Sequence, residues 1–75
     1  MKNVKGKSIK TLQLEMLANN VHFKSDCEFF PNFDVTGKVI RITLNNTEII
    51  IDVLTKNRKQ IKIGSNMKNL RYEIL

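Results

Sequence analysis

The sequence predicts a small all-β domain, an antiparallel barrel or rolled sheet of about five to six short strands. Three observations support this fold class. Apolar and polar residues alternate along most of the chain. Turn-forming residues separate these stretches at intervals of roughly 8 to 12 residues. The length of 75 residues leaves room for one core, and 41% hydrophobic with 27% charged residues exclude wholesale disorder and collagen-like structure.

The longest alternation runs from Val21 to Phe30, where apolar or small residues occupy the odd positions and mostly charged residues the even ones. A period of two is typical of a strand with one buried face. Pro31 cannot donate to a strand ladder, so we expect this strand to end there. Gly37 then permits a tight entry into the next strand.

A first hairpin is predicted around Asn45 and Asn46, because residues 39–44 and 48–53 alternate on either side of this pair. A two-residue loop at these asparagines would place Ile42 opposite Ile49, with both side chains on the core face. The register therefore depends on where the turn falls.

A second hairpin follows the first, and its register is constrained by the buried face. A three-residue loop keeps the apolar residues of both strands on one side by pairing Val53 with Ile61. The same register sets Lys62 opposite Asp52 on the other side. Residues 69–74 alternate again and predict a last strand, which would place Arg71 or Asn69 beside Lys62 on an outward face.

Residues 9–18 are ambiguous, because their amino acids are good helix formers while Leu12, Leu14 and Met16 alternate strictly with polar residues. On a helical wheel the leucines scatter instead of forming a stripe. As a strand, the segment would pair Met16 with Phe23 through a turn at the following asparagines. We predict a strand here; the alternative is a short N-terminal helix followed by a five-stranded SH3-like or Sm-like barrel.

Residues 1–8 lack apolar periodicity and are predicted to be a flexible basic tail, which leaves residues 9–75 as a single small β-barrel domain. The only cysteine, Cys27, cannot form an intramolecular disulfide, which favours a reducing compartment, and we expect a cytoplasmic protein. The longest aliphatic run has three residues, so we expect no membrane partner.

Catalysis is not expected, because the residues that suggest it do not converge. Cys27 and His22 lie an odd number of positions apart and would point to opposite sides of one strand, which excludes a nucleophile pair and a metal site built on them. Asp26 and Glu28 fit an exposed polar face. The three glycines are isolated, so no phosphate loop is present. We expect no enzyme, no metal and no cofactor.

The net charge of +6 is unevenly distributed. Residues 1–10 carry four lysines and no acid, residues 11–55 are net acidic, and residues 56–71 carry six cations and no acid. A polyanion is one partner that this pattern fits, and we predict binding to the backbone of DNA or RNA with weak sequence specificity. The candidate contacts are Lys56, Arg58, Lys59, Lys62, Lys68 and Arg71. Lysine, asparagine and isoleucine all have A/T-rich codons, so base composition is the competing explanation.

Two further sets of residues belong to these functional hypotheses. Phe30 and Phe33 are candidates for stacking on bases, although closing the open end of a barrel is the commoner role of such residues. Ile50 and Leu54 point away from the predicted core side and need a cover, which the loop at residues 30–33, the N-terminal segment or a partner subunit would provide. The alternative function is therefore a protein-interaction or oligomer-forming module.

Overall fold

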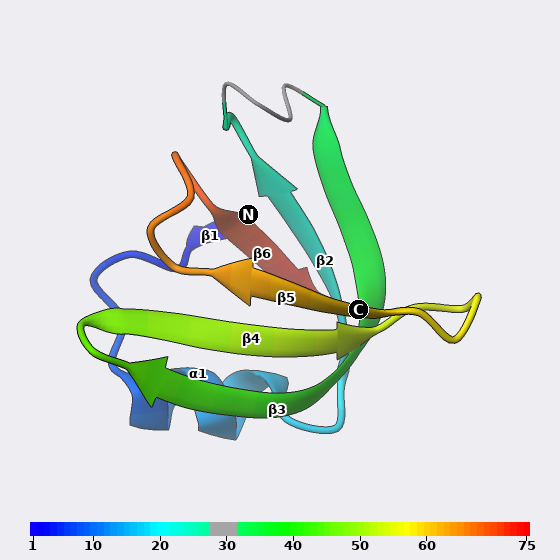
Figure 1. Cartoon of the computed structure of the whole chain (residues 1–75), viewed down its shortest axis with the longest axis horizontal. Coiled ribbons are helices and arrows are strands. Elements are labelled where there is room, and N and C mark those ends of the chain that lie inside the picture. The colour runs from blue at the N-terminus through cyan, green and yellow to red at the C-terminus, as the bar shows by residue number, and fades with distance from the viewer. Residues whose placement is uncertain (28–31) are drawn as a thin grey trace.

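The computed structural model describes residues 1–27 and 32–75, and over these residues the chain forms one antiparallel sheet of six strands with one short helix (Figure 1). The elements are β1 (Lys2–Asn3), α1 (Ile9–Met16), β2 (Asn20–Ser25), β3 (Phe33–Asn45), β4 (Glu48–Leu54), β5 (Gln60–Gly64) and β6 (Arg71–Ile74). The strand order is β1-β6-β2-β3-β4-β5, so the sheet stays open, with β1 and β5 at its edges. The predicted fold class, a small antiparallel rolled sheet, is confirmed.

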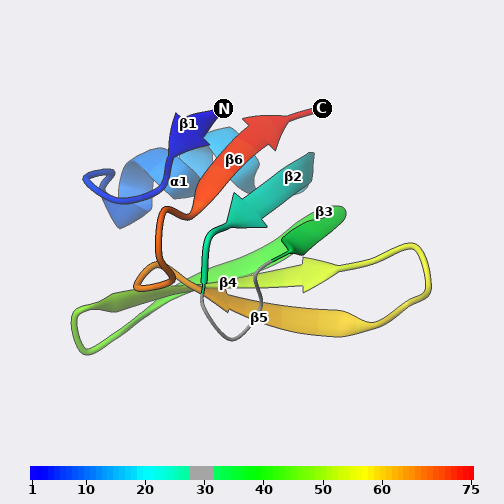
Figure 2. The same cartoon turned by 90° about the horizontal axis from the view of Figure 1, so that it is seen from above.

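The sheet rolls because the long strand β3 has different partners along its length. Residues 33–38 pair with β2, and residues 38–45 pair with β4 on the opposite edge. The register shifts between Val39 and Arg41, a β-bulge that bends the strand between its two halves. Figure 2 shows the consequence: β4 and β5 lie in one layer, and β2 and β6 lie in the other.

The predicted hairpin registers are partly right. In β4 and β5, Val53 pairs with Ile61 and Asp52 with Lys62, as the sequence predicts. In β3 and β4, Ile42 pairs with Ile51 and not with Ile49, because the turn lies one residue later than predicted. The shift along the strand is even, so Ile42 and Ile49 still face the core. The bulge changes the face beyond Ile42: Val39 is buried, whereas Ile40 is 42% exposed.

The strand predicted for residues 9–18 is wrong, because this segment contains α1. The Ser8 side chain caps the helix by accepting a hydrogen bond from the Thr11 N–H at 3.2 Å. Leu12 and Met16, one helical turn apart, are fully buried. The helix of the alternative fold is therefore present, ahead of the five strands β2 to β6. No helix among the described residues is long and apolar enough to span a membrane.

The tail predicted for residues 1–8 is likewise not what the structure shows. Lys2 and Asn3 form β1 and pair with Tyr72 and Arg71 of β6. The Val4 side chain is only 1% exposed and belongs to the core. This pairing adds a sixth strand at the outer edge of β6, whereas β6 itself occupies the edge of β2 with which the predicted strand 9–18 would have paired.

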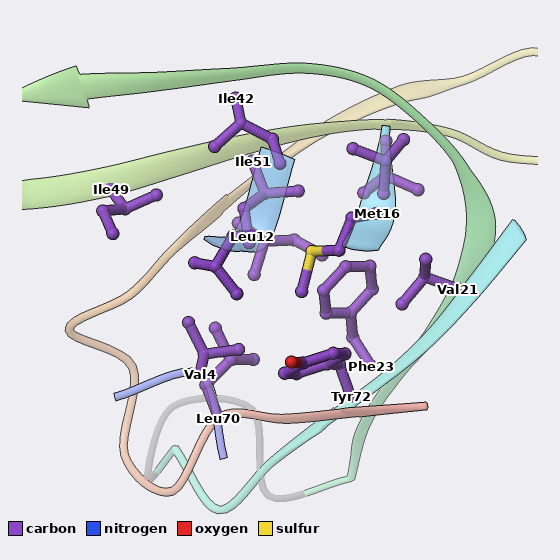
Figure 3. Packing of buried hydrophobic residues seen from close by; sticks show 13 residues of the cluster. Val4, Leu12, Met16, Val21, Phe23, Ile42, Ile49, Ile51, Leu70 and Tyr72 are labelled. Atoms are coloured by element: carbon purple, nitrogen blue, oxygen red, sulfur yellow. The ribbon is translucent and has the colours of Figure 1, made fainter. Parts of the chain in front are cut away.

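The core lies between the two layers and includes residues from every element except β1. Figure 3 shows the Phe23 and Tyr72 rings close together, with the Met16 thioether beside them. The Tyr72 hydroxyl reaches the edge of the core and donates a hydrogen bond to Glu15 Oε2 on α1. Burial raises the pKa of Tyr72, and this hydrogen bond lowers the pKa of Glu15.

Candidate nucleic-acid interface

The six predicted cations do not form one surface. The sequence-based interpretation places Lys62 and Arg71 side by side on neighbouring strands. In the structure these two strands are not neighbours: β5 pairs with β4, whereas β6 pairs with β2 and β1. The cations therefore fall into a group on the β4–β5 hairpin and a group after β5.

Lys62, on the β4–β5 hairpin, is held by a buried carboxylate. Its Nζ lies 3.1 Å from Asp52 Oδ1, and the Nε of Arg41 lies 4.0 Å from Asp52 Oδ2. The Asp52 side chain is 1% exposed, although it sits on the face of β4 opposite the core residues. One negative charge between two positive ones cancels part of their field, so Lys62 and Arg41 attract a phosphate less than free cations do.

The tip of this hairpin carries the remaining cations of the first group, Lys56, Arg58 and Lys59, all of them exposed. The Thr55 N–H donates to the Lys59 carbonyl at 2.9 Å, and the Arg58 N–H donates to the Thr55 carbonyl at 3.0 Å. Arg58 adopts a positive φ of 60°, which tightens the turn. None of the three forms an ion pair within the described part of the chain.

The second group contains one paired and one unpaired cation. Arg71 donates to Asp26 Oδ1 at 2.9 Å, and the side chain of Asn69 donates to Asp26 Oδ2 at 3.0 Å. Asp26 thus occupies the Arg71 guanidinium. Lys68, which precedes them, is exposed and has no ion-pair partner among the residues that the structure describes.

The two basic ends of the chain meet at this second group. The Val4 N–H donates to the Leu70 carbonyl at 3.0 Å, which places Lys5 beside the turn that carries Lys68 (Figure 1). A depression of about 530 Å³ lies between these segments. It is lined by Asn3, Lys5, Ser65, Asn66, Met67, Lys68, Asn69 and Leu70. We call it the Lys5–Lys68 depression; its lining holds two lysines and no acidic residue.

The turn that forms one wall of the depression is anchored on both sides. The Ser65 N–H donates to the Ile49 carbonyl, and the Ser65 hydroxyl accepts from the Ile49 N–H. Further along, the Lys68 carbonyl accepts hydrogen bonds from the Asp26 N–H and the Ser25 hydroxyl. These bonds fix the main chain at both ends of the turn, so the lysine side chain starts from a defined position.

The sequence assigns Lys68 to the predicted contact surface and Lys5 to a flexible tail, whereas in the structure both residues, with Asn3, line one depression. The signal was present in the charge distribution, because residues 1–10 and 56–71 are both basic and free of acids. Treating the first block as a tail hid their proximity. Only the pairing of β1 with β6 brings the two blocks together.

The predicted stacking and interface residues have mixed placements. Phe33 is half-buried and packs against the core, and Phe30 lies outside the described residues. Ile50 is half-buried, whereas Leu54 is 37% exposed. The structure therefore leaves Leu54 as the more accessible of the two interface candidates.

The sequence predicts His22 and Cys27 on one strand, but β2 ends at Ser25, so Cys27 lies beyond it. His22 hydrogen-bonds Asp34 across β2 and β3, and Cys27 is a half-buried free thiol. Within residues 1–27 and 32–75, no three side chains of the types that ligate metals lie close enough together to hold an ion.

No protein family, curated protein or solved structure matches this chain. The function is therefore argued from the geometry of the site.

Proposed function

We propose that this chain is a non-enzymatic module that binds the phosphate backbone of nucleic acid with weak sequence specificity. The observation that carries the proposal is the Lys5–Lys68 depression, where lysines from the two basic ends of the chain line one acid-free surface. Exposed ammonium groups without carboxylate partners attract phosphates and release the counterions condensed on them.

The arrangement of the arginines supports weak specificity. Arginine is the residue that reads guanine edges through paired hydrogen bonds. The chain has three arginines; Arg41 lies beside Asp52, and Arg71 is paired with Asp26. Only Arg58, at the hairpin tip, has no ion pair in the described ranges. Contacts from lysines to the backbone therefore dominate over contacts to bases.

The test is the salt dependence of binding to a nucleic-acid duplex. Each phosphate neutralised on duplex DNA contributes about −0.9 to the slope of log affinity against log salt. The double substitution Lys5→Gln and Lys68→Gln should flatten the slope by about 1.8 if each lysine contacts one phosphate. The control is Lys24→Gln, which removes an exposed lysine of β2 that lies outside the depression and opposite Asp34, and it should leave the slope nearly unchanged. An unmodified protein that shows no binding at about 50 mM salt would refute the proposal.

A second candidate function, a protein-interaction or oligomer-forming module, rests on the β5 edge. No other described strand pairs with the outer side of β5, and Leu54 on the neighbouring strand is partly exposed. An unpaired edge is a template for pairing with another chain. Light scattering at increasing concentration tests it: a mass above the monomer that Leu54→Ser reduces would favour assembly, and a monomer at every concentration would count against self-association.

A further inference from the structure

The Lys5–Lys68 depression is not the sole hollow lined by lysines, because Lys38 and Lys56 line another of about 470 Å³ that also has no acidic side chain. The Lys5–Lys68 depression differs in joining lysines from both basic blocks of the sequence, residues 1–10 and 56–71. The rest of the hairpin tip, which carries Arg58 and Lys59, projects into solvent (Figure 2). The depression encloses about 530 Å³, within the range of roughly 300 to 1,000 Å³ in which proteins hold small ligands. A single nucleotide is a ligand of this size class.

The lining of the depression also supplies neutral hydrogen-bonding groups. Asn3 and Asn66 line it, both residues are exposed, and neither side-chain amide has a hydrogen-bond partner within the described ranges. A primary amide offers a donor and an acceptor side by side, which is the pattern found on the edge of a nucleobase. Asn69, by contrast, is engaged with Asp26.

The charges and amides have complementary roles. Lys5 and Lys68 supply positive charge from both walls, which suits the phosphates on either side of one nucleotide. The amides suit the edge of the base itself. A base in a duplex is stacked and its pairing edge is occupied, so it reaches a concave site only after leaving the stack. An unpaired strand meets no such requirement.

We infer that the Lys5–Lys68 depression holds one unstacked nucleotide of a single strand, with Lys5 and Lys68 on its phosphates and Asn3 and Asn66 on its base. This inference rests on the proposed function and narrows its substrate class to single-stranded nucleic acid. It assigns a role to two asparagines that a purely electrostatic surface does not need.

The experiment compares two probes by fluorescence anisotropy at about 50 mM salt: a short labelled oligouridylate and a blunt RNA duplex of the same length. The unmodified protein should bind the single strand about tenfold more tightly than the duplex. Asn3→Ala with Asn66→Ala should weaken binding of the single strand roughly three- to tenfold and leave its salt slope unchanged, because no charge is removed. Binding of the duplex should not change.

The asparagine substitutions are suited to this test because the fold uses only the main chain at both positions. Asn3 pairs with Arg71 through its backbone, and the Asn66 N–H donates to Glu48 Oε2 at 3.2 Å. Alanine keeps both interactions, and an unchanged melting temperature verifies this. The matched control is Asn57→Ala, an exposed asparagine at the hairpin tip, which should leave both affinities unchanged.

The outcomes separate the inference from the proposed function. If neither probe binds, the proposed function fails and the inference fails with it. Equal affinity for both probes, or a double asparagine variant that binds the single strand as the unmodified protein does, overturns the inference alone. Backbone amide chemical shifts recorded with the oligouridylate provide an independent reading: they should change at residues 3–5 and 65–70, and changes confined to residues 56–62 would place the strand elsewhere.

Discussion

Replacing Gly37 with alanine tests how closely the two layers of the sheet approach each other. Gly37 is buried in β3, opposite Val21 of β2, just before the strand leaves β2 for β4. A Cβ atom at this position would lie 2.5 Å from the Leu54 carbonyl oxygen and 2.6 Å from Val53 Cγ1. The sequence suggests only that Gly37 permits a turn, whereas in the structure it lies within a strand and permits contact with the backbone of β4.

The magnitude follows from how far the neighbours must move. Ordinary contacts of a Cβ atom begin near 3.4 Å, so the Leu54 carbonyl has to retreat by about 0.9 Å. Overpacking of this kind costs roughly 1 to 3 kcal/mol, and removing a glycine from a strand returns about 0.5 to 1 kcal/mol. The middle of the two ranges gives a net destabilisation of about 1.2 kcal/mol for Gly37→Ala. For a domain of this size, that lowers the melting temperature by roughly 5 to 10 °C.

The assay is thermal unfolding followed by circular dichroism, with Gly64→Ala as the matched control. A Cβ atom at Gly64 meets only the carboxylate of Glu48, the end of a flexible side chain, which would move at the loss of its exposed hydrogen bond from the Asn66 N–H. We expect Gly64→Ala to cost less than about 1 kcal/mol, below the cost of Gly37→Ala. The reasoning is refuted if Gly37→Ala melts at or above the temperature of the unmodified protein, or if the two alanine variants are equally destabilised.

Two further predictions concern the contacts that hold the chain ends. The hydrogen bond from Tyr72 lowers the pKa of Glu15 below its ordinary value of 4.5. The ionised Glu15 carboxylate therefore stabilises the fold above pH 4.5, and this stabilisation is lost as the pH falls through the folded-state pKa. Tyr72→Phe should therefore flatten the decline of the urea midpoint between neutral pH and about pH 3, and an unchanged decline would contradict it. Val4→Ala removes two buried methyl groups and should cost about 2 kcal/mol, measurable by the same urea titration, whereas a flexible tail would give no change.

The strands were predictable where a single local rule determines the outcome. A period of two identified which side chains of β4 and β5 face the core, and the pairing of Val53 with Ile61 followed from keeping one face apolar. The same rule does not locate a turn, because a shift of two residues keeps every side chain on its face. The hairpin at Asn46 was therefore placed one residue too early, and Ile42 was paired with the wrong isoleucine.

The alternation of Leu12, Leu14 and Met16 predicts a strand where the chain forms α1. Ile9, Leu12 and Met16 share the face of α1 that packs against the core, a spacing of three and four residues. Leu14 is 79% exposed and Leu17 is 40% exposed, so neither contributes to that face. When Leu14 is counted as a core residue, the apolar positions alternate, and when Leu17 is counted as well, they no longer form one helical stripe. The cap at Ser8 and the helix-forming composition were the signals that favour α1 over a strand.

The Lys5–Lys68 depression depends on the pairing of β1 with β6, which no pattern within either segment predicts. Hairpin reasoning places β6 next to β5, where Arg71 would have joined Lys62. In the structure β6 pairs with β2, where Tyr72 lies opposite Phe23 inside the core. Because β6 pairs with β2 along one edge, its other edge is left for β1, which pairs there.

The consequence for binding is that Lys5 is held in place and not carried on a mobile arm. Val4 before it is buried, and the Val4 N–H is bonded to the Leu70 carbonyl, two residues after Lys68. The backbones of the two lysines are therefore fixed relative to each other before any ligand arrives. A ligand that bridges them orders two side chains but no main chain, and preorganised contacts of this kind lose less free energy on binding than contacts from a flexible tail.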